Sequence, residues 1–525
     1  MEYSTIAERK QSQLLERIPS QWRLSASLIP PGMHSAAESV NNVQYDRISV
    51  MDIPASCGLL SSKEIGITEN WDIRGLLGQI HTQRLTAKEV VQAFCKRAAI
   101  AHQITRCLTE PLFESALRRA EELDDHLRRT GNPIGPLHGL PISVKDSFNI
   151  RGVDSSVGIA ALALHPAEAD APLVSLLTSL GAIIITKTNV PQTMGALDSA
   201  NHLFGRTLNP LNRQLTAGGS TGGEGALIAL RGSMIGFGTD IGGSIRIPAM
   251  CNGLYGFKPS HGRVPYGGQT DGQPKAKGRI SIQAVAGPIA RSVADIDAVM
   301  THLIPRAQWF GEDCIPGAWP SPLSSLGQKR PITIGVLQSD GLVEPLPPIT
   351  KVLNEVASTL RRTPGINVVE IPVPKALSKC QALAGRLMGV DGSVTMMDLL
   401  ESTGETLIPW LRGRTKRGRP LLLSQLAELQ AQRGAIELEL RRKLWMLDSG
   451  HEQKVDAIIL PVAPHPVPEL DRYNAVGYTS SFVLLDYPAG VVPVRKFNEA
   501  DLERGVDMVK PVIGSWDKAN RELCM

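Results

Sequence analysis

Apolar residues recur at two different spacings along the chain. Residues 86–98 carry a capping box, Thr86 with Glu89, followed by an apolar face at helical spacing, which predicts a helix. Short apolar runs predict buried strands at 140–144, 182–186, 234–237, 332–337, 366–371 and 457–460. Helical patterns lie between them at 112–127, 171–180, 223–230, 352–361 and 421–446. Strands that alternate with helices indicate an α/β fold, with a sheet covered by helices.

The first 70 residues differ from the rest of the chain. A helical pattern at 6–15 is followed by the proline-rich break at 29–32, and a further helix is predicted from residue 71 to 78. We therefore expect an N-terminal helical extension over residues 1–70 and one large domain over residues 71–525.

Composition excludes several classes of protein. Of the 525 residues, 42% are hydrophobic and 20% are charged, which is typical of a globular protein rather than a disordered one. No apolar run is long enough for a membrane helix and the first residues are polar, so we expect a cytoplasmic protein with no membrane partner. The net charge of +4 is small, so no nucleic-acid partner is expected. The basic cluster at 412–419 is interpreted as a solvated loop.

Cysteine and histidine usage argues against a metal site. The seven cysteines are scattered and never spaced as C-x-x-C, and the eleven histidines form no H-x-x-x-H or H-x-E cluster. We expect no disulfide scaffold and no bound metal.

Two glycine-rich segments, at 218–225 and 238–246, each place a serine among glycines. A phosphate-binding loop needs Lys and Ser/Thr after its last glycine, but Ala226 and Leu227 stand there. The spacing around Ser220 matches the nucleophile elbow of α/β-hydrolases, although the residues before it are loop-like and no Asp and His pair follows. A purely structural turn is the third interpretation, and the second serine, Ser244, lies only 24 residues later.

A serine hydroxyl near neutral pH needs an adjacent base to become a nucleophile. No histidine is well placed in either segment. Lys145 follows the apolar run at 140–144, where burial would lower its pKa and leave a neutral amine. Such a lysine could also be a surface residue or pair with an aspartate, so the residues alone leave its role open.

Three segments together resemble the amidase signature family: 138–146 (HGLPISVKD), 218–227 (GGSTGGEGAL) and 238–246 (GTDIGGSIR). The segments 187–194, 204–207 and 251–256 are similar to its fungal acetamidase-like branch. The resemblance extends to about residue 495, with a motif core at 135–295. It implies a single large domain with a twisted mixed β-sheet and helices on both faces.

The resemblance also implies a Ser-Ser-Lys triad and a cofactor-independent amide hydrolase. Ser244 would be the nucleophile that forms an acyl-enzyme. Ser220, which the family holds on a cis peptide bond, would pass protons between Ser244 and Lys145, the general base. Small-molecule amides would be the substrates, and a homodimer is possible in this family.

Further site residues follow from the same resemblance. The backbone N–H groups of Ile241, Gly242, Gly243 and Ser244 would form the oxyanion hole, and Ser220 and Met194 would lie beside the substrate. Two charged residues flank the nucleophile, and we hypothesise that they fix its loop by an ion pair: Asp240 and Arg246.

The end of the chain departs from the family pattern. After residue 489 the family usually continues with a Pro-Val-Gly-Leu-Gln-type strand and a closing helix, which this sequence lacks. We therefore expect a truncated C-terminal end. Two alternatives follow, a non-catalytic relative that acts as a binding or structural protein, and an ammonia-supplying subunit of a transamidase. The sequence does not fix the acyl group.

Overall fold

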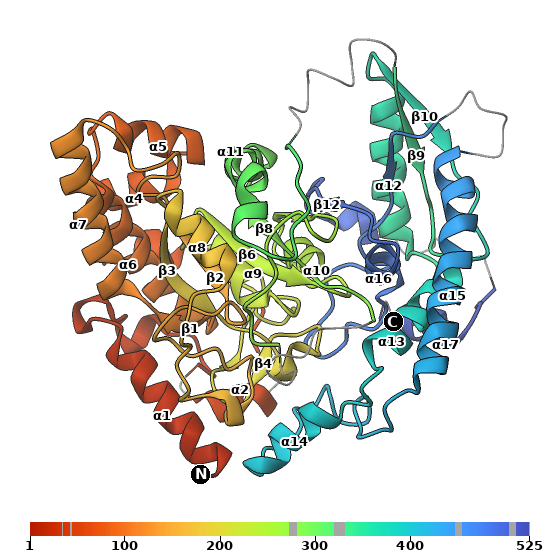
Figure 1. Ribbon diagram of the computed structural model, residues 1–525, viewed down its shortest axis with the longest axis horizontal. Helices are drawn as coiled ribbons and strands as arrows, with labels where there is room; N and C mark the ends of the chain where they lie inside the picture. Colours follow the sequence, from red (N-terminus) through yellow and green to blue (C-terminus); the bar gives the residue numbers. More distant parts are fainter. Residues whose placement is uncertain are drawn as a thin grey trace.

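The computed structural model describes residues 1–33, 35–41, 45–271, 281–319, 331–446, 454–502 and 511–523. Its centre is a seven-stranded sheet in the order β1-β3-β2-β6-β8-β7-β12 (Figure 1). The strands are β1 (Leu108–Pro111), β2 (Pro141–Lys145), β3 (Ile183–Thr188), β6 (Ile235–Asp240), β7 (Tyr255–Lys258), β8 (Val285–Ala290) and β12 (Ala489–Val491). β2 is parallel to β3 and β6, and the other pairs are antiparallel. The predicted mixed sheet is confirmed.

Two smaller sheets complete the strands. β9 (Ile332–Val336) lies between β10 (Ile366–Glu370) and β11 (Ala457–Ile459) in a parallel sheet. β4 (Ala200–Asn201) pairs with β5 (Gly205–Arg206). The strands predicted at 332–337, 366–371 and 457–460 therefore exist, but they form a sheet of their own and do not extend the central one.

Most of the helices lie at positions that the apolar periodicity predicts. The capping box of Thr86 and Glu89 begins α6. Helices α6 and α9 contact β2 and β3 and each other, whereas α8 contacts β3 and α11 contacts β8. The helical bounds are α1 (Tyr3–Glu16), α2 (Ala36–Asn41), α3 (Ile53–Ser56), α4 (Ser62–Glu69), α5 (Ile73–His81), α6 (Ala87–Thr105), α7 (Phe113–Thr130), α8 (Pro172–Ser179), α9 (Gly222–Ala229), α10 (Arg246–Cys251), α11 (Val293–Leu303), α12 (Pro347–Arg361), α13 (Cys380–Met388), α14 (Val394–Ser402), α15 (Leu423–Leu440), α16 (Gly477–Leu484) and α17 (Ser515–Arg521).

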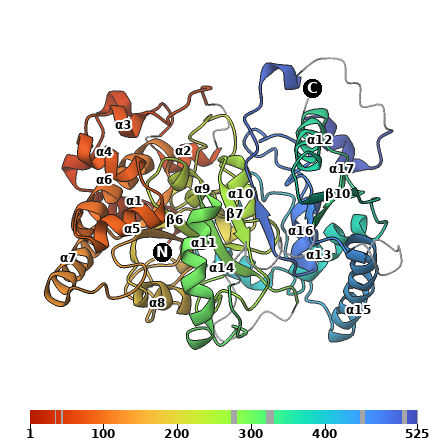
Figure 2. The same cartoon turned by 90° about the horizontal axis from the view of Figure 1, so that it is seen from above.

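The early and late helices lie at opposite ends of the molecule when it is viewed from above (Figure 2). At one end (red and orange), α1, α6 and α7 pack against the central sheet, α4 packs on α6 and α5 packs on α11. At the other end, α15 packs on α13, and α13 packs on α16. The long helix predicted over 421–446 is α15 with a π-helical turn, Arg441–Met446, at its end.

The N-terminal segment is helical and packs into the central core. Ile6, Leu14 and Trp22 belong to the same apolar cluster as the strands of the central sheet. Lys10 of α1 is buried, and its Nζ lies 2.8 Å from Asp154 Oδ2 and also pairs with Glu110 of β1. The first helix is therefore held by buried ion pairs as well as by apolar contact.

Within the described ranges, no helix combines the length and the apolar character needed to cross a bilayer.

Candidate active site

The topology brings Lys145 and the two serine segments to one edge of the central sheet. Lys145 is the last residue of β2, and β2 is the parallel neighbour of β6. Their carboxyl ends therefore meet at the same edge, which is where α/β proteins place their sites. Ser244 lies in the loop from β6 to α10, and Ser220 lies just before α9.

Lys145 is fully buried and contacts Ser220. Its Nζ lies 2.7 Å from Ser220 Oγ and 2.8 Å from Thr239 Oγ1. Burial lowers the pKa of Lys145 to about 7, although Asp240, Glu224 and Asp146 act in the opposite direction. A lysine with this pKa is largely a neutral amine just above neutral pH, so it can accept a proton. The Gly219–Ser220 peptide bond is cis.

The hydroxyl of Ser244 makes no hydrogen bond with any residue that the structure describes, and the side chain remains 7% exposed. The structure thus joins Lys145 to Ser220 by a hydrogen bond, and it places Ser244 on the neighbouring loop without one to Ser220. An unengaged hydroxyl is available for a substrate, and catalytic hydrogen bonds often tighten only when substrate is bound.

The loop around Ser244 carries the four backbone N–H groups that the family resemblance assigns to the oxyanion hole. The Gly243 N–H donates to Asp240 Oδ1 at 2.8 Å, which fixes the loop, and the part of Gly243 in the oxyanion hole stays a prediction. Among described residues, the N–H groups of Ile241, Gly242 and Ser244 find no acceptor. Gly243 also adopts a φ of +134°, which L side chains rarely reach.

Asp240 and Arg246 form the ion pair expected of them. The Arg246 Nε and Nη2 atoms lie 3.0 and 2.9 Å from the two carboxylate oxygens, and both side chains are buried. Burial alone would raise the pKa of Asp240, but Arg246 holds it below its usual value. Asp240 also accepts the Ile245 N–H at 3.2 Å, so one carboxylate fixes both ends of the loop that carries Ser244.

Two supporting residues escaped the sequence analysis. Thr479 of α16 donates to the carbonyl of Gly242 at 2.5 Å and so fixes the loop that carries Ser244. Glu224 of α9 is fully buried and accepts from Ser143 at 2.5 Å and Thr188 at 3.0 Å. Burial raises the pKa of Glu224 to about 8, which weakens the negative charge that would otherwise favour the protonated form of Lys145.

Met194 lies in a strained turn beside an apolar wall. Thr193 and Met194 have φ angles of 64° and 56°. The side chain of Met194 packs against a small apolar cluster that joins the first half of the chain to α14 and the residues after it: Val157, Ile159, Met397, Leu400 and Leu407.

A pair of polar side chains, Gln192 and Glu405, attaches this wall like a latch, and no local sequence pattern indicates the pair. Gln192 Nε2 lies 2.7 Å from Glu405 Oε1, and the Ile408 N–H donates to Gln192 Oε1 at 3.0 Å. Glu405 also accepts the Ala160 N–H at 2.7 Å. Burial raises the pKa of Glu405 to about 7. The segment after α14 is thus fixed to the Met194 turn.

Comparisons with known proteins indicate the family of this chain. The model of the family named Amidase matches residues 89–509. The acetamidase of Aspergillus oryzae is 34% identical over 98% of this chain and 92% of its own length. The acetamidase of Emericella nidulans is 33% identical over 97% and 90%. A solved structure of fatty acid amide hydrolase superposes with a TM-score of 0.85 and 28% identity, covering 99% of this chain and 88% of that one.

Proposed function

Because the chain belongs to the amidase family, we propose that it hydrolyses a linear carboxylic acid amide to the acid and ammonia through an acyl-enzyme on Ser244. The contact between the buried amine of Lys145 and the hydroxyl of Ser220, at 2.7 Å, is the observation that supports this mechanism most directly. Without a base in contact with it, a serine hydroxyl is a poor nucleophile.

In the first half of the reaction, neutral Lys145 accepts the proton of Ser220 while Ser220 accepts the proton of Ser244. The Ser244 oxygen attacks the amide carbonyl carbon. The resulting oxyanion accepts hydrogen bonds from the free N–H groups of the loop. A single donor of this kind stabilises the transition state by about 3–4 kcal/mol. The proton then returns through Ser220 to the leaving nitrogen, and ammonia departs.

In the second half, water replaces the amine. It transfers a proton along the same path to Lys145 and attacks the acyl carbon, which releases the acid and restores Ser244. Each proton that leaves an attacking group is returned to a leaving group, so no cofactor is required.

The acyl group is proposed to be apolar. Met194, Met397 and Leu400 lie in one apolar cluster beside the Met194 turn. Burial of an apolar acyl chain against such side chains contributes about 0.8 kcal/mol per methylene. The names of the relatives, acetamidase and fatty acid amide hydrolase, cover both short and long acyl chains.

Labelling with a serine-directed fluorophosphonate tests the proposal. We expect mass spectrometry to find the label on Ser244, and Lys145→Met to slow labelling at pH 8 by about 10²–10⁴-fold. Lys187→Met is the matched control, because Lys187 is also fully buried but donates to Ser155 and the Asp154 carbonyl. Label on another serine, or an unchanged rate in Lys145→Met, contradicts the mechanism.

A screen of ammonia release from acetamide, hexanamide, benzamide and a long-chain amide then identifies the acyl group. Turnover by the isolated chain excludes a subunit that needs a transamidase partner. A folded protein that is neither labelled nor active on any of these amides would instead be the non-catalytic relative.

A further inference from the structure

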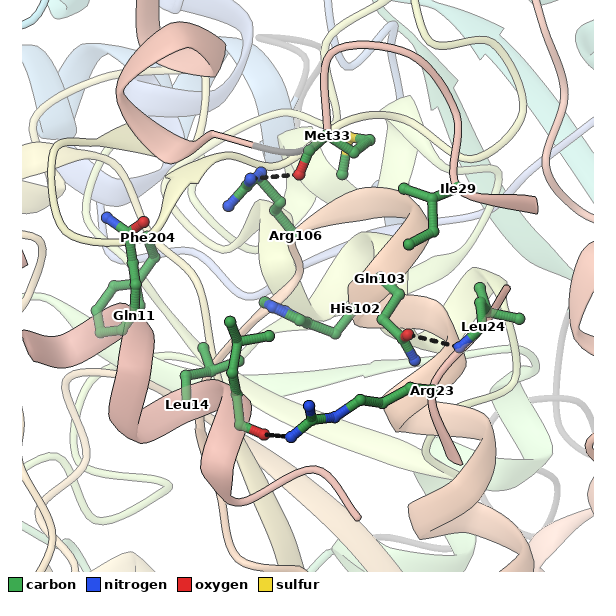
Figure 3. A pocket seen from close by; sticks show the side chains of 11 residues that line it. Gln11, Leu14, Arg23, Leu24, Ile29, Met33, His102, Gln103, Arg106 and Phe204 are labelled. Carbon is green, nitrogen blue, oxygen red and sulfur yellow. Dashed lines mark hydrogen bonds between the residues drawn. The ribbon is translucent and has the colours of Figure 1, made fainter. Parts of the chain in front are cut away.

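A cavity of about 270 Å³ lies between the N-terminal segment and the end of α6, and none of the triad residues lines it. Figure 3 shows Arg106 and Met33 at one end, Arg23 at the opposite end, and His102 between them. Leu15 and Arg23 are exposed, whereas Arg106, His102 and Met33 are buried, so the cavity opens near Arg23 and ends at Arg106.

The walls are mostly apolar, and each polar side chain among them carries at least one N–H donor. No Asp or Glu lines the cavity among the residues that the structure describes. Its lining residues are Gln11, Leu14, Leu15, Arg23, Leu24, Ile29, Met33, His102, Gln103, Arg106 and Phe204. An apolar cavity with a few convergent polar groups is typical of a small-ligand site.

Arg106 at the inner end is a buried cation without a carboxylate. Its Nη2 donates to the Met33 carbonyl, Nε is buried without a hydrogen-bond partner, and Nη1 donates to no described residue. Burial lowers the pKa of Arg106 to about 10, and Tyr45 is the one ionisable group that acts in the opposite direction. An arginine presents five N–H donors, so most of the capacity of this guanidinium is unused.

Two other buried arginines of this protein have the carboxylate partner that Arg106 lacks. Arg206 pairs with both Asp198 and Asp471, and Arg246 pairs with Asp240. Arg213 also lacks a carboxylate partner, but it lies outside the cavity and its guanidinium stacks over the ring of Tyr45 at 5.1 Å. Arg106 combines a guanidinium without a described carboxylate partner with an adjoining cavity.

His102, next along the cavity from Arg106, adds a neutral donor. Its Nδ1 accepts the Leu108 N–H at 3.2 Å, so the proton of the neutral ring resides on Nε2. Burial lowers the pKa of His102 to about 3, which keeps the ring neutral. Nε2 has no acceptor among the described residues, and His102 lines the cavity.

We propose that this cavity is a second binding site, separate from the triad, for a small amphipathic monocarboxylate. The carboxylate binds Arg106 and the His102 Nε2–H at the closed end, and the alkyl chain lies against Leu14, Ile29 and Phe204 toward the mouth. The carboxylate supplies both the counter-charge and the two acceptors that the guanidinium lacks. An uncharged alcohol of the same length supplies neither.

Isothermal titration of the full chain with sodium hexanoate tests the site, and it needs no turnover, so it does not rest on the proposed function. We expect one hexanoate per chain. Arg106→Gln should weaken binding at least about tenfold, because a hydrogen bond to a charged group contributes about 1.5–3 kcal/mol. Arg128→Gln, an exposed arginine on α7, should leave it unchanged.

Two comparison ligands and a second variant complete the test. Hexan-1-ol should not bind measurably, and acetate should bind at least about tenfold more weakly than hexanoate because it lacks the alkyl chain. Leu15→Trp places a large ring at the mouth without touching Arg106 and should abolish binding. Hexanoate binding that is unchanged in Arg106→Gln, or an alcohol that binds as tightly as the acid, overturns the proposal. If thermal unfolding shows that Arg106→Gln is not folded, unchanged binding by Leu15→Trp overturns it.

Discussion

Replacing Lys145 by methionine should affect catalysis and stability through the same proton. The pKa of this amine falls from 10.5 in a free lysine to about 7 in the fold because the side chain is buried. Methionine has nearly the same length and cannot be charged. The variant therefore removes the proposed general base and, at the same time, the cost of burying an ammonium group.

The magnitude follows from proton linkage. Between pH 7 and 10.5 the unfolded chain binds a proton at Lys145 that the folded chain has lost, so the stability of the wild type rises with pH. The slope is about 1.4 kcal/mol per pH unit, or about 3 kcal/mol from pH 7 to pH 9. Lys145→Met lacks this increment. The loss of the hydrogen bonds to Ser220 and Thr239 adds an offset that does not change with pH.

Two measurements check the same pKa. Chemical denaturation of wild type and variant at pH 7, 8 and 9 should give a stability difference that moves in favour of the wild type as the pH rises. The rate of fluorophosphonate labelling of wild-type Ser244 should fall below pH 7, to about a tenth of its plateau at pH 6, because the amine becomes protonated. A stability difference that does not change with pH, together with a labelling rate that has no inflection near 7, would refute the reasoning.

Three further substitutions test other parts of the site. Asp240→Ala leaves Arg246 buried without its partner and should cost about 3–5 kcal/mol of unfolding free energy, while an unchanged denaturation midpoint would contradict a loop-fixing role. Lys10→Ala leaves the buried carboxylate of Asp154 without its ion-pair partner, while Glu110 keeps Arg17, and should cost a similar amount by the same assay, unless α1 is held by apolar contact alone. Glu405→Ala breaks the latch on the Met194 turn and should raise KM for apolar amides by about tenfold, with little effect on labelling by a small fluorophosphonate.

Helices and strands with a regular apolar pattern could be predicted from the sequence. The capping box fixed the start of α6, and the apolar runs fixed β2, β3 and β6 to within a few residues. β7 and β8 were missed because glycine and proline interrupt them. Gly256 lies within β7, and Gly287 and Pro288 lie within β8, where such residues normally argue against a strand.

In the site, too, local contacts could be predicted from the sequence and long-range contacts could not. Lys145 was placed at the end of a buried strand from its neighbours in sequence, and the structure puts its amine against Ser220. Thr479 lies 237 residues after the carbonyl that it holds, and Glu405 lies 213 residues after its amide partner, so no local pattern could pair them. The engagement of the Gly243 N–H depends on the path of the backbone, which side-chain types do not reveal.

The contact between Gln192 and Glu405 joins two parts of the chain, one that carries the proposed reaction chemistry and one that completes the apolar wall. Every group that we propose to move a proton or to contact the oxyanion comes from residues 145–246, whereas the apolar wall beside Met194 is completed by a segment that begins at α14 and is fastened by a few polar contacts. Evolution could exchange that segment to accommodate a different acyl group while the reaction chemistry stayed intact. For enzyme engineering, libraries confined to residues 394–411 offer the most direct way to retarget this scaffold.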